Sequence, residues 1–318
     1  MRALITGAGG FAGRHLAKHL AEVTDWELWG NARPHPEGPV SAGRHGLRIA
    51  QADLTDWEAT RSLLADLRPD YIFHLAAQSI VQEALRDPQA TLMNNIVGEL
   101  NVLRAMHELE LPARVLLVGS GEEYGRVCPE DLPVDEDTPF RPDNPYAVSK
   151  IAQDMLGLQY WLAYKLPIIR VRPFNHIGPG QSDDFVTAAF ARQVAAIEAG
   201  RQEPVLRVGN LNAERDFTDV RDMVRAYHLA MTQGEPGEVY NIGSGTPTAI
   251  SDILAAFLSM SSADVRVERD PARLRPSDVP RIVCDPARFH ERTGWLPEIG
   301  LEESLADILN DWRNRVSG

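Results

Sequence analysis

T-G-A-G-G-F-A-G, residues 6–13, follows a short apolar run and precedes the helical pattern R-H-L-A-K-H-L-A (14–21). It places glycines at Gly7, Gly10 and Gly13. In this G-x-x-G-x-x-G spacing, the first glycine permits a tight turn, the second lets the backbone approach a pyrophosphate, and the third lets the helix pack closely on the strand. The amino end of the helix adds unpaired N–H groups and a favourable dipole. The stretch therefore predicts a strand–turn–helix unit that binds a dinucleotide.

Short apolar runs alternate with helical patterns over the first 175 residues. The runs that we interpret as strands lie at 2–6, 27–31, 71–76, 114–120 and 167–175, with another strand ending near Asp53. Between them, 57–67 and 94–106 carry apolar residues at spacings of three and four. This alternation is typical of βαβ units on a parallel sheet with helices on both faces. We therefore expect an α/β fold with a Rossmann-type doubly wound parallel sheet.

The chain changes character after Phe174, where the turn-rich N-H-I-G-P-G-Q must leave the sheet. We expect a dinucleotide-binding Rossmann domain over 1–175. Residues 176–318 should form a smaller C-terminal α/β lobe that binds the substrate. Within them, about 216–245 should return to the first domain and bring V-Y-N-I-G (239–243) back to its sheet.

The composition is that of an ordinary globular protein. The 318 residues are 44% hydrophobic, and 32 basic against 45 acidic residues give a net charge of −13. Without a basic block, this balance argues against nucleic acid and membrane surfaces as partners, and no apolar run approaches the roughly 20 residues of a membrane span. Cys128 and Cys284 are too few for a disulfide framework and lack metal-ligand spacing. We therefore expect no metal site and reduced thiols in a cytoplasmic protein.

The second strand bears on the choice of cofactor. An acidic residue at its end would bind the ribose 2′-hydroxyl of NAD, but the chain offers Asn31 and Arg33 there. The missing acid and the available guanidinium favour NADP, with NAD as the alternative; Arg33 could equally be a solvated loop residue. Asp53 is placed either to meet the adenine edge or to cap the following helix. The sequence leaves both roles open for Asp53.

Hydroxyl groups suited to carbonyl chemistry occur at two places. In N-P-Y-A-V-S-K (144–150), Tyr146 and Lys150 lie one helical turn apart on the same face. An ammonium beside a phenol favours the phenolate, so we expect Lys150 to lower the pKa of Tyr146 toward the working range. Ser120, in G-S-G-E-E-Y-G (119–125), would give a second hydrogen bond to the same substrate oxygen.

Together these motifs resemble the extended short-chain dehydrogenase/reductase family along nearly the whole chain. The resemblance implies a catalytic set of Ser120, Tyr146 and Lys150, and Asn95 of M-N-N-I-V-G as a residue that orders the active site. It also implies that H-L-A-A-Q-S (74–79) lies beside the nicotinamide. The implied cofactor contacts are Gly7, Gly10, Phe11, Gly13, Asn31, Arg33, Asp53, Leu54, Leu75, Ala76, Ala77, Tyr146 and Lys150. A homodimer built on helices 94–107 and 146–164 is usual for the family.

Within that family, three stretches resemble enzymes that act on GDP-linked 6-deoxyhexoses: R-P-F-N-H-I-G-P-G-Q (172–181), E-R-D-F-T-D-V-R-D (214–222) and the motifs between 275 and 295. The resemblance implies that Ser79 and Asn175 touch the sugar and its phosphates. It also implies that Arg215 and Arg275 hold the diphosphate, for which guanidinium forks are suited. The expected activity is NAD(P)H-dependent reduction of a C4 ketone on a GDP-linked 4-keto-6-deoxyhexose.

Two adjacent carboxylates follow Ser120 and raise an alternative. Sugar-nucleotide 4,6-dehydratases resemble this chain and keep a glutamate at the position of Glu122, as the base that removes the C5 proton. Their neighbouring Asp or Ser corresponds to Gly121, which can neither donate a proton nor hold a water. H-I-G-P-G-Q also stands where GDP-mannose dehydratases would have H-E-S-P-R-R. We therefore expect a reductase in which Glu122 contacts the sugar, with the dehydratase as the alternative.

We expect Glu123, the second of the two adjacent carboxylates, to face away from the site and to be solvated. A non-catalytic dinucleotide-binding protein on the same fold would have no need to keep Ser120, Tyr146 and Lys150 together.

Overall fold

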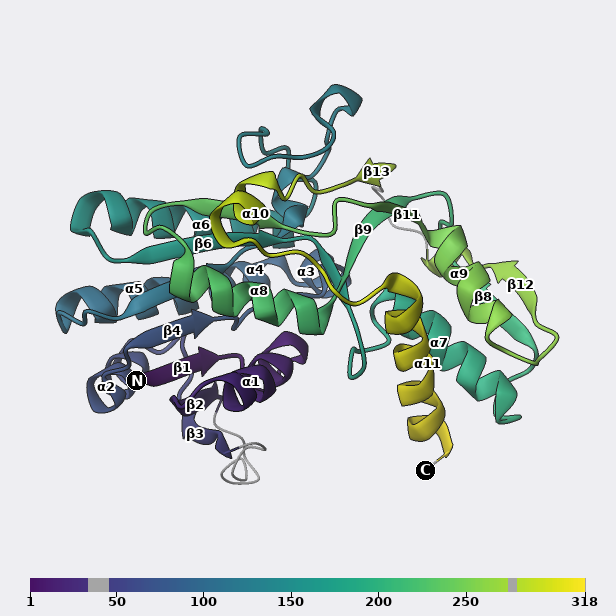
Figure 1. The fold of residues 1–318 in the computed structure, drawn as a ribbon, viewed down its shortest axis with the longest axis horizontal. Coiled ribbons are helices and arrows are strands. Elements are labelled where there is room, and N and C mark those ends of the chain that lie inside the picture. The colour runs from purple at the N-terminus through teal and green to yellow at the C-terminus, as the bar shows by residue number, and fades with distance from the viewer. Residues whose placement is uncertain (34–45, 274–278, 318) are drawn as a thin grey trace.

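The computed structural model describes residues 1–33, 46–273 and 279–317. A seven-stranded parallel sheet lies at the centre of the larger of its two parts (Figure 1). The strand order is β10-β6-β5-β4-β1-β2-β3, and every neighbouring pair is parallel. The strands are β1 (Arg2–Thr6), β2 (Glu27–Ala32), β3 (Arg48–Gln51), β4 (Tyr71–His74), β5 (Arg114–Val118), β6 (Ile168–Pro173) and β10 (Val239–Ile242). The doubly wound sheet is thus confirmed, and β10 lies at its edge beside β6.

Helices cover both faces of this sheet, and neighbouring residues of one strand face different cores. Ile5 of β1 packs in the core shared with α1 (Phe11–Val23) and α8 (Val220–Gln233). Leu4 of the same strand packs in the core shared with α2 (Trp57–Leu67) and α5 (Gly98–Glu108). Because successive side chains of a strand point to opposite faces, a strand buried on both sides must be apolar throughout. This explains the continuous apolar runs in the sequence.

Two helices that pack on the large sheet carry residues of the candidate site. The helix predicted from 146 is α6 (Pro145–Tyr164), and the side chain of Asn144 caps it by accepting from Ala147 N at 2.9 Å. The stretch predicted as helical from 94 begins as a π-helical turn, η2 (Met93–Val97), and continues as α5. The short helices α3 (Val81–Arg86) and α4 (Pro88–Leu92) precede it.

The C-terminal half builds a second core beside the carboxyl edge of the sheet. Its helices are α7 (Val186–Glu198), α9 (Ile250–Ser259) and α11 (Leu301–Ser317), which lie together in Figure 1. The strands are β7 (Asn175–Ile177), β8 (Val205–Val208), β9 (Glu214–Asp219), β11 (Pro247–Ala249), β12 (Arg266–Arg269) and β13 (Arg281–Ile282). Outside these two groups lie α10 (Ala287–Thr293) and three 3₁₀ turns. The turns are η3 (Gly121–Tyr124) and η4 (Pro129–Asp131) in the first half of the chain and η5 (Pro271–Arg273) in the second.

The two halves interlock, because β9 runs directly into α8 on the face of the large sheet. The division at residue 175 remains a prediction. Within the described residues, no helix combines the length and the apolar character needed to cross a bilayer.

Candidate active site

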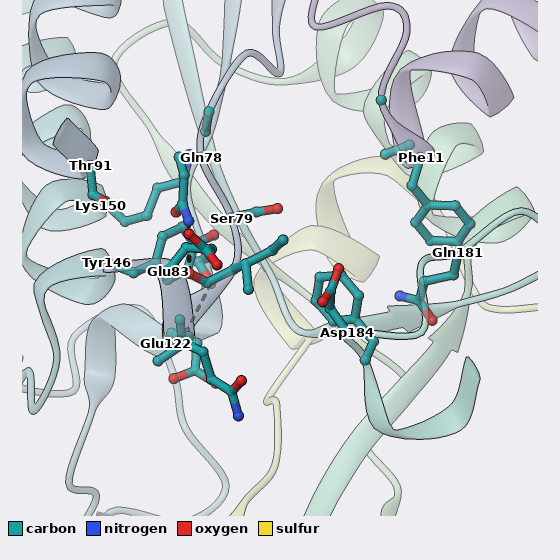
Figure 2. A pocket seen from close by; sticks show the side chains of 18 of the residues that line it. Phe11, Gln78, Ser79, Glu83, Thr91, Glu122, Tyr146, Lys150, Gln181 and Asp184 are labelled. Atoms are coloured by element: carbon teal, nitrogen blue, oxygen red, sulfur yellow. Dashed lines mark hydrogen bonds between the residues drawn. The ribbon is translucent and has the colours of Figure 1, made fainter. Parts of the chain in front are cut away.

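A cavity of about 1620 Å³ runs along the carboxyl edge of the large sheet and continues between the sheet and the second core. The strand order reverses between β1 and β4, and ligands of open α/β sheets bind in the crevice at such a point. In Figure 2, Tyr146, Lys150 and Glu122 lie on one side of this space, and Phe11, Gln181 and Asp184 lie on the other. The cavity therefore brings together residues from both halves of the chain.

The glycine-rich turn has the close approaches that the sequence predicted. Gly7 has a φ of +70°, and a Cβ at this position would lie 2.9 Å from Ala76 N. At Gly13 a Cβ would lie 2.2 Å from Gly7 O, so only glycine lets α1 pack this closely on the turn. The helix starts after Gly10, which has no side chain to cap the first N–H groups. These groups therefore face the cavity as a fitting cradle for a pyrophosphate.

The part of the cavity beside β2 contains Asn31, Arg33 and Asp53. The buried Asn31 is tied to the sheet edge because its Nδ2 donates to Ala52 O at 3.0 Å. The exposed Arg33 lies with its Nε 4.0 Å from Asp53 Oδ1. Asp53 Oδ1 accepts from Thr55 N at 2.9 Å and from Thr55 Oγ1 at 2.8 Å.

The capping role considered for Asp53 is wrong. Asp56 caps α2, since its Oδ1 accepts from Ala59 N at 2.9 Å. Asp56 lies three residues closer to α2 than Asp53 does. Its side chain can therefore reach the N–H groups of the first helical turn, as a capping side chain must.

The two hydroxyls that the sequence predicts to be catalytic, on Ser120 and Tyr146, both line the cavity. Tyr146 is buried, and burial raises its pKa. The nearby Ser120 hydroxyl opposes this rise in the pKa, and the carboxylates of Glu122 and Glu123 add to it. The expectation that Lys150 would lower this pKa is therefore wrong for the structure. Lys150 Nζ instead donates to Val118 O at 2.8 Å, and desolvation of the phenolate decides the sign.

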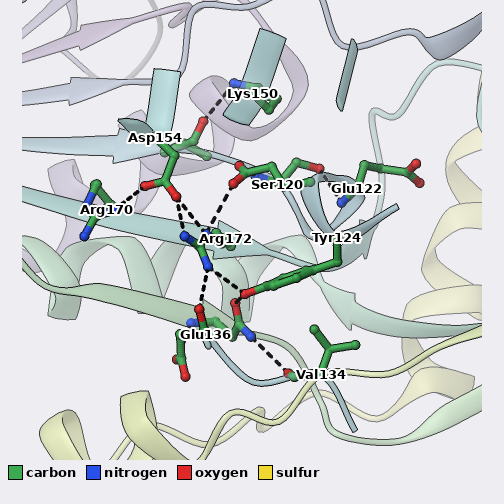
Figure 3. Close-up of polar contacts among 12 residues, drawn as sticks. Ser120, Glu122, Tyr124, Val134, Glu136, Lys150, Asp154, Arg170 and Arg172 are labelled. Atoms are coloured by element: carbon green, nitrogen blue, oxygen red, sulfur yellow. Dashed lines mark hydrogen bonds and ion pairs between the residues drawn. The ribbon is translucent and has the colours of Figure 1, made fainter. Parts of the chain in front are cut away.

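The expectation that Glu123 is solvated is also wrong, because Glu123 is buried. Its Oε1 accepts from Ser120 N at 2.7 Å, while Ser120 Oγ accepts from Glu122 N at 3.2 Å. The other carboxylate oxygen lies 3.2 Å from Arg172 Nε. A Cβ at Gly119 would lie 2.3 Å from Glu123 Oε1, so that glycine leaves room for the carboxylate. Glu123 thus holds Ser120 in place by accepting from its backbone N–H. Figure 3 shows Ser120 and Arg172, the two residues that Glu123 connects.

Glu122 and the expected substrate residues line the cavity. They are Glu122, Ser79, Asn175 and Arg215. Arg215 Nη1 donates to Glu214 O at 2.8 Å and to Val279 O at 2.7 Å, which fixes the side chain at the end of β9. Arg275 lies outside the described residues.

Asn95 connects the segment after β4 to α6. Its Oδ1 accepts from Gln78 N at 2.8 Å, and its Nδ2 donates to Gln78 O at 3.1 Å and to Ser149 Oγ at 2.9 Å. Asn95 is fully buried, so these contacts hold the H-L-A-A-Q-S segment against the helix that carries Tyr146 and Lys150. This is the ordering role that the resemblance implied.

Comparisons with known proteins match the chain over nearly its full length. A family model described as GDP-mannose 4,6 dehydratase matches residues 4–308. The chain belongs to the GDP-mannose 4,6-dehydratase family.

Proteins named for different activities resemble this chain. It is 39% identical over 316 residues to GDP-6-deoxy-D-mannose reductase of Pseudomonas aeruginosa, covering 99% of this chain and 98% of that protein. It is 30% identical to GDP-mannose 4,6-dehydratase of Yersinia enterocolitica, covering 97% and 92%. The solved structure of RMD from Pseudomonas aeruginosa complexed with NADPH has a TM-score of 0.87 at 37% identity and covers 99% of each chain. The predicted short-chain dehydrogenase/reductase resemblance, with its fold and its oxidoreductase class, is confirmed.

Several residues of this family member line the cavity without having been predicted. They are Glu83, Gln181, Asp184, Arg207, Phe217 and Tyr227. Most come from the second half of the chain, where the motifs at 172–181 and 214–222 predicted Asn175 and Arg215 but none of these side chains. Gln181 stands at the end of H-I-G-P-G-Q, and its Nε2 donates to His176 O at 2.9 Å. The signal available in the sequence for Gln181 was its position as a polar residue at the end of a turn-rich stretch.

Proposed function

We propose that this chain reduces the C4 ketone of GDP-4-dehydro-6-deoxy-D-mannose with NADPH and forms GDP-D-rhamnose. The reductase of Pseudomonas aeruginosa supports this activity, because it resembles the chain over almost its whole length. A similar structure bound to NADPH supports the choice of cofactor. The uncapped helix start beyond Gly10 and the side chain of Arg33 fit the pyrophosphate and the additional phosphate of NADP.

The observation that carries this proposal is that Ser120, Tyr146 and Lys150 line one cavity together with the glycine-rich turn. NADPH, when bound, supplies the hydride that adds to C4. Tyr146 then gives its phenolic proton to the carbonyl oxygen as the C–O double bond becomes single, and solvent returns a proton to Tyr146. Because the pKa of Tyr146 is raised, the phenol holds this proton at neutral pH. Ser120 donates a hydrogen bond to the same oxygen and stabilises its developing charge.

The environment of Gly121 favours a reductase over a dehydratase. A Cβ at Gly121 would lie 3.1 Å from ring atoms of Phe174, so a serine or aspartate there would require Phe174 to shift. The position next to Ser120 thus has no proton donor and little room for one.

The second candidate, GDP-mannose 4,6-dehydratase, is favoured by Glu122. This carboxylate lines the cavity close enough to Tyr146 to raise the pKa of the phenol. It stands where a base for the C5 proton would have to be.

We assign the second half of the cavity to the GDP-sugar. Ser79 and Asn175 are proposed to contact the sugar and its phosphates, and Arg215 and Arg275 to hold the diphosphate. The chain carries a net charge of −13, so such local guanidinium groups are needed to bind a dianion.

We also propose a homodimer formed through η2, α5 and α6. Large apolar side chains are exposed on these helices at Met93, Val148, Met155 and Leu162, where a second copy could cover them. Light scattering coupled to size exclusion tests this state, and a monomer at micromolar concentration would contradict it.

Parallel assays test the proposed activity. In one, the enzyme receives NADPH and GDP-4-dehydro-6-deoxy-D-mannose; in the other, it receives GDP-mannose and no added cofactor. Oxidation of NADPH in the first and no reaction in the second are expected. The Glu122→Gln variant should keep ketone reduction within about tenfold, because no proton is removed from carbon. Conversion of GDP-mannose to a 4-keto-6-deoxy sugar, lost in Glu122→Gln, would establish the dehydratase instead.

A further inference from the structure

Lys150 carries its charge in a place with little access to water. Its side chain is 4% exposed, and its donation to Val118 O uses one of the three N–H groups of the ammonium. A buried ammonium is stable only with an opposite charge or several acceptors nearby. An opposite charge or further acceptors must therefore lie close to Lys150.

Three carboxylates and three cations of this region are buried: Glu99, Glu123, Asp154, Lys150, Arg170 and Arg172. Figure 3 shows Lys150, Asp154, Arg170 and Arg172. Asp154 Oδ1 lies 2.8 Å from Arg170 Nη1, and its Oδ2 pairs with Arg172. Glu123 pairs with Arg172 and accepts from Ser120 N. Two carboxylates are thus committed to the two arginines, which leaves Glu99 and Lys150.

Glu99 contacts the helix of Lys150 through Gln153. It lies on α5 and is 1% exposed. Its Oε2 accepts from Gln153 Nε2 at 2.9 Å, and Gln153 follows Lys150 by three residues on the same face of α6. Its Oε1 is buried and has no hydrogen-bond partner among the described residues. A carboxylate with a free acceptor is therefore held beside the helical turn that carries the ammonium.

The electrostatics of the two groups agree with this geometry. Burial lowers the pKa of Lys150, and the charges of Glu99 and then Glu123 oppose that shift. Burial raises the pKa of Glu99 well above its usual value, and the charge of Lys150 opposes that shift while Asp154 and Glu123 add to it. His74 on β4 also faces Lys150, and burial and the lysine charge lower its pKa to about 3, which leaves it neutral.

We propose that Glu99 is the buried counter-ion of Lys150 and acts as a positioning residue for the proposed ketone reduction. Glu99 keeps the ammonium charged and aimed at the C-terminal end of β5, behind Ser120 and Tyr146. Its catalytic relevance rests on the proposed function, whereas the pairing itself is a property of the chain alone.

The lysine content of the chain permits a direct test. Lys18, Lys150 and Lys165 are its three lysines, so protein carrying ¹³C at the lysine Cε gives three NMR signals whose shifts follow protonation of Nζ. Lys150→Met assigns the relevant signal. In Glu99→Gln the titration midpoint of Lys150 should fall by about one pH unit or more, a tenfold change in its acid constant. An unchanged midpoint would overturn the pairing.

Glu108→Gln is the matched control, because Glu108 lies on the same helix and pairs with the surface residue Arg104 at 2.8 Å. It should leave the Lys150 signal unchanged. If Glu99→Gln does not fold, Gln153→Met removes the hydrogen bond that lowers the pKa of Glu99. It should move the Lys150 midpoint in the same direction, and a folded Gln153→Met with no movement would contradict the proposal.

The pH dependence of turnover gives the second readout. In Glu99→Gln the alkaline fall of kcat for ketone reduction should begin about one pH unit lower, with KM for the sugar unchanged. A structural defect alone would lower kcat equally at all pH values. The NMR titration requires no substrate, so an enzyme that fails to reduce the ketosugar would contradict the proposed function and leave the test of the pairing intact.

Discussion

Glu123 Oε1 accepts a hydrogen bond from the backbone N–H of Ser120 at 2.7 Å. The proposed catalytic serine is thereby fixed by a residue that never enters the cavity. The same carboxylate faces Arg172, which Asp154 and the hydroxyl of Tyr124 also contact. The strand end that carries Ser120 therefore depends on a buried ionic network for its position.

Replacing Glu123 should destabilise the fold. Glu123→Ala leaves Ser120 N without its acceptor and leaves Arg172 with one carboxylate fewer, and breaking a buried ion pair costs about 3–5 kcal/mol. Glu123→Gln retains an acceptor for Ser120 N and should lose less. Urea unfolding measures both. Glu130→Ala, an exposed acid in η4, should stay within about 0.5 kcal/mol of the wild type; an equally small loss in Glu123→Ala would refute the structural role.

Tyr146→Phe should lower kcat for ketone reduction by about a hundredfold or more, because the proton donor is lost. NADPH affinity, measured by fluorescence, should change little. Tyr164→Phe removes an exposed phenol from the same helix and should leave kcat unchanged. Comparable rates in Tyr146→Phe and the wild type would exclude Tyr146 as the acid.

Arg33→Ala should weaken NADPH binding about tenfold or more and leave NADH binding unaltered, since a hydrogen bond to a charged group contributes about 1.5–3 kcal/mol. Arg48→Ala, an exposed arginine on the adjacent strand that pairs with Glu27, is the control. Titration with each nucleotide measures the effect. Equal losses for NADPH and NADH would show that Arg33 does not contact the additional phosphate.

His74 should make stability depend on pH. Burial and then the charge of Lys150 lower its folded pKa to about 3, whereas the unfolded value is about 6.5. The unfolded chain therefore takes up a proton that the folded chain refuses, so stability is present above pH 6.5 and is lost as pH falls toward 3. Between pH 7 and pH 5 the loss from this group is about 2 kcal/mol. His74→Asn should reduce the fall by that amount in urea unfolding, and an identical fall in both proteins would contradict the prediction.

The sequence predicted those features that short local patterns determine. The glycine spacing at Gly7, Gly10 and Gly13 and the alternation of apolar runs with helical patterns were sufficient for the doubly wound sheet. Tyr146 and Lys150 were found because one helical turn separates them. Even the returning strand β10 followed from a short apolar run.

The features that the sequence did not predict depend on contacts between residues far apart in the sequence and on the burial that these contacts impose. Glu123 was taken as solvated because its partner Arg172 lies on another strand, and no local pattern pairs the two. The sign of the Tyr146 pKa shift was wrong because proximity to Lys150 was weighed without the desolvation that burial imposes. Glu99 gave no signal for a similar reason, since only the packing of α5 on α6 brings it to Gln153.

Transfer of deuterium from NADPH to the sugar tests the central claim most directly. NADPH labelled at the transferable C4 position is incubated with the enzyme and GDP-4-dehydro-6-deoxy-D-mannose, and the product is examined by proton NMR. The proposed reduction predicts that the sugar H4 signal disappears, because deuterium occupies C4, and that the C6 methyl group remains unlabelled. Product with protium at C4, or full recovery of labelled NADPH, would contradict the account.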